Sequence, residues 1–205
     1  MLVLDPDEAF PDSTFIEDVA VLTQHCAIVT RPAAPSRAGE TDDIARILPD
    51  YFQRIETICE PGTLDGGDVM QIGKHFYVGL SDRTNNEGAR QLLTILDTYG
   101  LSGSTIPVTE FLHLKTGVTA LADSTLIAAG ECAHRPEFAG FNILPVSREE
   151  AGAANCIRIN DHILMPAGFP AVRDRLKGHC RKIIEVDISE FAKLDGGLTC
   201  LSLRF

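Results

Sequence analysis

The sequence lacks tryptophan, has only three methionines, and contains no long uninterrupted run of apolar residues. A membrane-spanning helix needs about 20 mostly apolar residues in succession, so this absence argues against a membrane protein. The first residues, Met1–Asp5, do not have the pattern of a signal peptide. Hydrophobic residues still make up 44% of the 205 positions and charged residues 23%, which is typical of a globular protein. We therefore expect one domain over residues 1–205 with a buried core.

The sequence also lacks closely spaced cysteine pairs and an excess of basic residues. The six cysteines include no C-x-x-C pair, so their spacing indicates neither a zinc site nor a disulfide framework. Free thiols in a reducing cytosol are the better interpretation. The 18 basic residues are outnumbered by 29 acidic ones, which gives a net charge of −11. This balance argues against a nucleic-acid partner and is compatible with a cationic one.

What the sequence does contain is a repeat of short apolar segments. The segments occur in pairs, and two to four polar residues divide each pair, which is the spacing of a β-hairpin. The predicted strand pairs are 19–22 with 26–30, 68–72 with 76–80, 118–121 with 125–129, and 156–159 with 162–165.

A helix and a third strand are expected to complete each unit. Helices are predicted over 40–52, 84–99 and 169–178, with Thr84 as the N-cap of the second. After the third strand pair the chain is rich in proline and glycine, so we expect that unit to lack its helix. The closing strands are predicted at 55–58, 105–108, 142–146 and 183–186.

The order strand, turn, strand, helix, strand recurs in four units, with the helix absent from the third, and indicates an α/β fold built by radial repetition, a pseudo-symmetric propeller. A fifth unit is represented by a predicted strand over 199–203 and by residues 1–4, which have the pattern of a unit's last strand. In a ring, the two ends of the chain would share this unit. Its second strand and its helix are not found in the sequence.

Each unit starts with small or polar residues, which would converge at the centre of a ring. They supply carboxylates, one histidine, one lysine and cysteine thiols, the components of a thiol nucleophile with a proton shuttle and a cation-binding cradle. A guanidinium fits such a cradle because it is planar, cationic and open to attack at carbon. The unit starts are FIED (15–18), LDGGD (64–68), LHLKT (112–116), ANC (154–156) and GGLTC (196–200).

Each of these residues taken singly has a simpler structural interpretation. His113 alone could be a core histidine, the stretch from Asp65 to Asp68 a turn, and Cys200 a buried inert thiol. Arg37 and Arg83 alone could be surface residues. The functional interpretation therefore depends on the whole ordered set.

That set resembles the dimethylarginine dimethylaminohydrolases of the guanidino-group-modifying enzymes. The likeness is carried in order by FIEDVAV (15–21), TRPAAPSR (30–37), LDGGDV (64–69), LSDRTN (80–85), LHLKT (112–116) and DGGLTC (195–200). It implies a five-bladed α/β propeller, the pentein fold, acting without metal or organic cofactor. Family members begin with a strand, a loop and a helix before the segment matching residues 1–4, so this N-terminal piece is expected to be missing here.

The resemblance also implies roles for particular residues. Cys200 would attack the guanidinium carbon, and His113, with Asp65 near it, would protonate the departing dimethylamine and then activate water against an S-alkylthiouronium intermediate to give citrulline. The implied substrate-binding positions are Asp18 with Glu17 beside it for the guanidinium, Asp12 for the α-amine, Arg37 and Arg83 for the α-carboxylate, and the backbone carbonyl of Leu194.

Lys115 separates the dimethylaminohydrolases from related enzymes. Deiminases and amidinotransferases typically place an aspartate two residues after the histidine, whereas this chain has Lys115 there. The expected function is therefore hydrolysis of a methylated arginine, a small cationic guanidino substrate, with no nucleic-acid or membrane partner. An arginine deiminase and an inactive guanidino-binding or truncated pseudo-enzyme are the alternatives. Mono- against dimethylated substrate and a homo-oligomeric state are left open.

Overall fold

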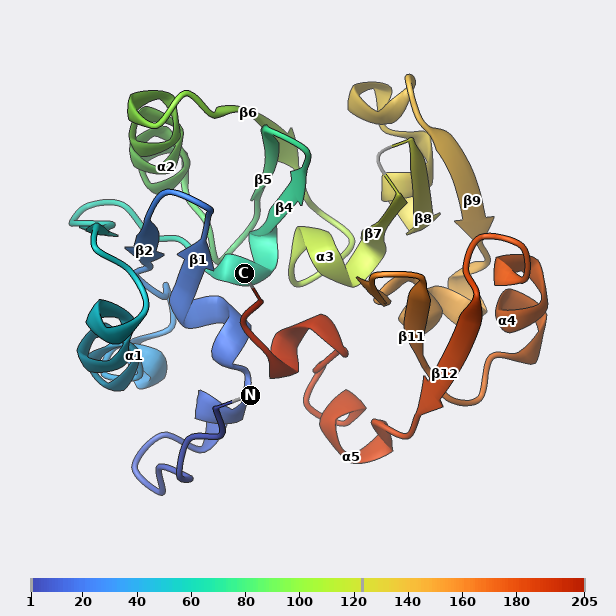
Figure 1. Cartoon of the computed structure of the whole chain (residues 1–205), viewed down its shortest axis with the longest axis horizontal. Helices are drawn as coiled ribbons and strands as arrows, with labels where there is room; N and C mark the ends of the chain where they lie inside the picture. Colours follow the sequence, from blue (N-terminus) through green and yellow to red (C-terminus); the bar gives the residue numbers. More distant parts are fainter. Residues whose placement is uncertain (1, 123, 205) are drawn as a thin grey trace.

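The structure, a computed structural model, describes residues 2–122 and 124–204. Within this part of the chain, four three-stranded sheets are arranged around a common centre (Figure 1). In every sheet the first two strands form an antiparallel hairpin, and the third strand runs parallel to the second. The predicted radial repeat, and with it the α/β propeller, is confirmed.

The strands lie within a few residues of their predicted bounds because apolar runs and turn residues mark them clearly. Gly73 and Asn160 have φ angles of +59° and +51° in the hairpin turns, a left-handed conformation that glycine and asparagine tolerate best. In chain order the sheets are β1 (Ala20–Leu22), β2 (Ala27–Val29) and β3 (Ile55–Thr57); β4 (Val69–Ile72), β5 (His75–Leu80) and β6 (Ser102–Pro107); β7 (Val118–Ala122), β8 (Thr125–Ala129) and β9 (Asn142–Val146); and β10 (Ile157–Ile159), β11 (His162–Pro166) and β12 (Lys182–Val186).

Helices connect the second and third strands of three units, as predicted: α1 (Thr41–Ile47), α2 (Asn86–Thr98) and α4 (Pro170–Leu176). The predicted N-cap of α2 was wrong. Asn85 caps the helix by accepting a hydrogen bond from the Gly88 amide at 2.8 Å, whereas the Thr84 hydroxyl is buried and donates to Asp68. In the third unit, two 3₁₀ turns replace the helix, as the prolines and glycines indicated: η6 (Gly130–His134) and η7 (Pro136–Phe138).

A short helical turn begins each unit and lies toward the centre of the ring (Figure 1). These turns are η2 (Ile16–Val19), η5 (Gly66–Asp68), α3 (Leu114–Gly117), η8 (Arg148–Ala154) and, at the start of the fifth unit, η9 (Thr199–Leu201). The remaining short elements are η1 (Pro11–Thr14), η3 (Pro35–Arg37), η4 (Leu48–Asp50) and α5 (Ser189–Ala192). The site is built from the first group.

The strand predicted over 199–203 was wrong, because η9 occupies its first half. Ser202 then has extended dihedral angles, but no described strand lies beside it to supply the hydrogen bonds of a ladder. Leu2–Leu4 do not form a strand either, and Met1 lies outside the described residues.

The apolar core is divided into clusters that join neighbouring units. One cluster includes Phe76 and Leu92 of the second unit together with Ile28 of the first, and another includes Ile163 of the fourth unit together with Ile127 of the third. The apolar residues thus pack between neighbouring units. None of the described helices has the length and apolar character needed to cross a membrane.

Candidate active site

The turns at the unit starts bring ionisable side chains from four of the five units into one buried group. Each member is at most 9% exposed, so their charges act on one another with little screening by water. The members are Glu17 and Asp18 of η2, Asp65 just before η5, His113 just before α3, and Cys200 of η9.

His113 is surrounded by carboxylates. Its Nε2 lies 3.1 Å from Oδ2 of Asp65 and 4.0 Å from Oδ1 of Asp18. Burial alone would lower the pKa of His113, but the hydrogen bond with Asp65 and the negative charges of Asp18, Asp68 and Asp65 raise it to about 9. The imidazole is therefore protonated at neutral pH and can act as an acid.

Gly67 allows His113 and Asp18 to approach each other closely. A Cβ at this position would stand 2.7 Å from Nδ1 of His113 and 2.8 Å from Oδ1 of Asp18. Its own amide donates to Oδ1 of Asp18 at 2.9 Å. The glycine pair of the LDGGD segment thus has a packing role that a turn alone does not require.

Cys200 is a thiol in a negatively charged surrounding. Burial and the charges of Glu17 and Asp18 raise its pKa to about 11, although the Gly197 amide, 3.4 Å from Sγ, and the charge of Lys115 act in the opposite direction. The thiol is thus largely uncharged at neutral pH in the free protein.

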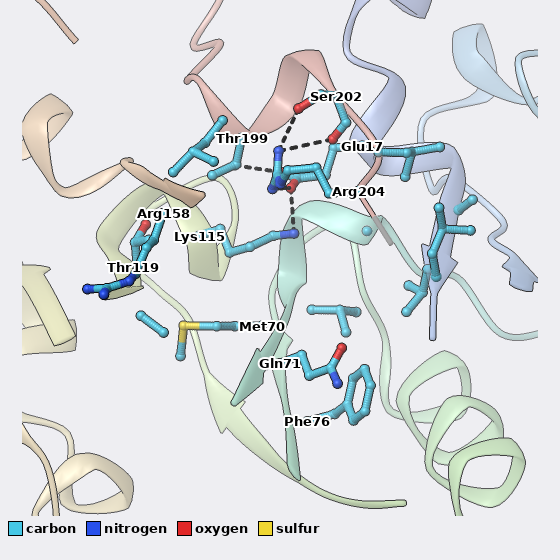
Figure 2. Close-up of a pocket in the computed structure, with 18 of the residues that line it drawn as sticks. Glu17, Met70, Gln71, Phe76, Lys115, Thr119, Arg158, Thr199, Ser202 and Arg204 are labelled. Atoms are coloured by element: carbon cyan, nitrogen blue, oxygen red, sulfur yellow. Dashed lines mark hydrogen bonds and ion pairs between the residues drawn. The ribbon is translucent and has the colours of Figure 1, made fainter. Parts of the chain in front are cut away.

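Glu17 is the centre of a hydrogen-bond network with Lys115, Thr199 and Arg204 (Figure 2). One carboxylate oxygen lies 2.7 Å from Nζ of Lys115 and 3.4 Å from Nη2 of Arg204. The other accepts a hydrogen bond from the Thr199 hydroxyl at 2.7 Å. The same residues line a cavity of about 230 Å³ together with residues of β1, β4, β7 and β10. Cys200 and His113 do not line this cavity, so the cavity lies beside these two side chains and does not contain them.

The other predicted binding residues have different surroundings. Arg37 is buried, and its guanidinium donates to Asp18 at 2.6 Å, to Glu40 at 2.7 Å, and to the carbonyl of Asp12 at 3.3 Å. Among the described residues, no hydrogen bond or ion pair joins the side chain of Arg83 to this group, and Leu194 is 63% exposed. Their roles toward substrate stay predictions.

Asp18, Asp65 and His113 also form a group whose potential metal-ligating atoms all lie within 4.8 Å of one another. Each of these side chains already has a protein partner, since Asp18 binds Arg37 and Gly67, and Asp65 binds His113. The expectation that the reaction needs no metal or organic cofactor stays a prediction.

Two buried residues at unit starts were given no role from the sequence. Asp68 accepts hydrogen bonds from Ser81 and Thr84, each at 2.7 Å, and from the amide of Leu114 at 2.9 Å. Asn155 is hydrogen-bonded to Thr199 and to the carbonyl of Lys115. The position of Asn155 in the repeat indicates a place at the centre, since Asn155 stands two residues before β10 just as Asp18 stands two residues before β1.

Comparison with known proteins gives clear relatives, although no family profile matches the chain. The chain is 50% identical over 204 residues to the N(G),N(G)-dimethylarginine dimethylaminohydrolase of Pseudomonas aeruginosa, covering 99% of this chain and 80% of that protein. It is 40% identical to the protein of that name from Streptomyces coelicolor, covering 99% and 78%.

Comparison with solved structures gives the same family and fold. A cysteine-to-serine mutant of the Pseudomonas aeruginosa enzyme in complex with citrulline superposes with a TM-score of 0.94 at 50% identity, covering 98% of this chain and 79% of that one. The N-terminal domain of a cyanobacterial arginine dihydrolase bound to its product has a TM-score of 0.87 at 19% identity, with 97% and 77% covered. The latter likeness concerns the fold alone.

Proposed function

The chain belongs to the dimethylarginine dimethylaminohydrolase family, and we propose that it hydrolyses Nω-methylated arginine to citrulline and a methylamine with Cys200 as the nucleophile. The observation that carries this proposal is a buried group in which Asp18 lies 4.0 Å from a protonated His113 and, together with Glu17, acts electrostatically on the thiol of Cys200. Such a group suits a substrate that is cationic, is attacked at carbon, and releases a basic amine.

A guanidinium complements this group electrostatically. The carboxylates of Glu17 and Asp18 both raise the pKa of Cys200, so a cation bound against them would offset two causes of that shift and favour the thiolate. Asp18 already accepts a hydrogen bond from the guanidinium of Arg37, which indicates that its surroundings admit a planar cation. Substrate binding and activation of the nucleophile would thus be coupled.

The proposed reaction has two halves. The Cys200 thiolate adds to the guanidinium carbon, the bond from that carbon to the methylated nitrogen breaks, and the amine leaves with the proton of His113. This yields the S-alkylthiouronium. Water then adds to the same carbon and gives one proton to His113. The carbon–sulfur bond breaks with Cys200 leaving as the thiolate, the remaining hydroxyl proton passes to solvent, and citrulline leaves. The hydrogen bond of Asp65 favours the protonated imidazole needed in the first half.

Lys115 supports a methylated substrate over an unmethylated one. A carboxylate at this position would pair with the second guanidinium nitrogen, whereas the ammonium of Lys115 is held by Glu17 at 2.7 Å. A methylated nitrogen has fewer donors and more bulk, so the loss of one carboxylate is compatible with it.

The test is product analysis with monomethylarginine, asymmetric dimethylarginine and arginine as separate substrates. We expect citrulline in equal amount to methylamine or dimethylamine, little ammonia from arginine, and no product with Cys200→Ser. Ammonia from arginine at a rate equal to or above that of amine release would instead show a deiminase. Binding of dimethylarginine without turnover, equal in the wild type and in Cys200→Ser, would contradict the enzymatic proposal.

A further inference from the structure

We infer that Asn155 is a positioning residue that holds the cysteine-bearing turn in register with the histidine-bearing turn; this inference deepens the proposed function and rests on it. The two turns belong to different units: His113 precedes α3, and Cys200 lies in η9. Asn155 follows η8 in the unit between them along the chain. It does not touch the reacting atoms.

The side chain of Asn155 spans the gap between these turns with three hydrogen bonds. Its Nδ2 donates to the carbonyl of Lys115 in α3 at 2.8 Å and to Oγ1 of Thr199 at 3.0 Å. Its Oδ1 accepts from the amide of Thr199 at 2.9 Å. Both donors and one acceptor site of the amide are therefore used, and the side chain is shielded from water at 4% exposure.

Asn155 also supports the segment that contacts the sulfur. A Cβ on Gly197 would stand 2.5 Å from Cγ of Asn155, so the amide group of Asn155 packs directly on the backbone at Gly197. The amide of Gly197 lies 3.4 Å from Sγ of Cys200 and lowers the pKa of that thiol. Asn155 thus fixes the residue just before the cysteine and the backbone donor that faces the sulfur.

A further pair of hydrogen bonds connects Asn155, through Thr199, to the carboxylate of Glu17. The Thr199 hydroxyl accepts from Asn155 and donates to Oε2 of Glu17 at 2.7 Å. Loss of Asn155 would therefore free both the η9 turn and the hydroxyl that orients Glu17. Since Glu17 acts on the thiol, we expect the effect to appear in the ionisation of Cys200 as well as in turnover.

The experiment compares Asn155→Ala and Asn155→Leu with the wild type. The leucine keeps the approximate shape and adds no charge but loses both donors and the acceptor, so it serves if the alanine variant folds poorly. Iodoacetamide labelling of the peptide that contains Cys200, measured across pH, reports thiol ionisation whether or not the protein turns over dimethylarginine. We expect its midpoint to move upward in both variants, and kcat to fall roughly 10- to 100-fold with KM changed less than about threefold.

Asn85→Ala is the matched control, because Asn85 also makes three hydrogen bonds, to Thr63, Gly88 and Pro61. We expect it to lower the melting temperature without moving the labelling profile of Cys200. If the Asn155 variants only lower the melting temperature and keep the wild-type labelling profile and kcat per folded molecule, Asn155 merely supports the fold and the inference fails. A shifted profile in a protein without dimethylarginine turnover would uphold it while the proposed function fails.

Discussion

At the scale of single residues, a protonated histidine buried among carboxylates makes the stability of this protein depend on pH. Protonation of His113 is favoured in the folded state because Asp65, Asp18 and Asp68 surround it, and its pKa is about 9 against 6.5 for the ordinary side chain. A pKa that is higher in the folded than in the unfolded state means that folding is coupled to proton uptake.

We predict a pH-dependent stability difference between the wild type and His113→Gln. The contribution of the charged imidazole is complete below pH of about 6.5 and is lost as the pH rises through about 9. The excess free energy of unfolding of the wild type, from urea titrations at several pH values, should therefore shrink over this range. A difference that stays constant between pH 6 and pH 10 would contradict the assignment of a protonated His113.

The sequence did not reveal every side-chain partner of the predicted site residues. The motifs single out Asp18 and Arg37 as substrate-binding positions, but only the structure shows that their side chains bind each other. Glu40, which completes that contact, lies in no motif. Such pairings depend on how η2, η3 and α1 pack, which a one-dimensional pattern does not specify.

At the scale of elements, local chemistry explains where prediction succeeded and where it failed. The hairpins followed from apolar runs divided by turn residues, and α2 from its helical spacing of leucines. Thr84 was the expected cap, but Thr84 and Asn85 are both good N-cap residues; the hydroxyl of Thr84 donates to Asp68, and Asn85 caps the helix. The strand expected at 199–203 failed because strand formation also needs a partner, which composition does not report.

At Gly88 in α2, we predict that an alanine destabilises the protein, contrary to what helix propensity alone would suggest. Glycine to alanine inside a helix ordinarily stabilises by about 1 kcal/mol. Here the new Cβ would stand 2.0 Å from the carbonyl oxygen of Thr63, so α2 and the backbone segment at Thr63 must move apart. We expect Gly88→Ala to lower the free energy of unfolding by at least about 1 kcal/mol in urea titrations.

Gly140→Ala is the control for that prediction, since nothing lies within 4 Å of a Cβ built at Gly140. Its free energy of unfolding should stay within about 0.5 kcal/mol of the wild type. Stabilisation by Gly88→Ala would mean that α2 is not held against Thr63 as the structure has it.

At the scale of the whole molecule, radial repetition accounts for the fold and for the place of the site. Apolar residues pack between neighbouring units, and each unit start contributes a short turn to the centre (Figure 1). The repeat could be predicted because its signals are local and recur in order. The proposed catalytic roles came from the resemblance to a family, because repetition places residues at a centre without assigning chemistry to them.

The central claim is that Cys200 forms a covalent bond to the guanidinium carbon, and acid-quenched mass spectrometry after mixing with asymmetric dimethylarginine tests it most directly. We predict a transient adduct on the peptide containing Cys200, with the mass of the substrate less that of dimethylamine. It should decay as citrulline accumulates and be absent in Cys200→Ser. Citrulline formation without such an adduct at any time, or at an equal rate in Cys200→Ser, would contradict the account.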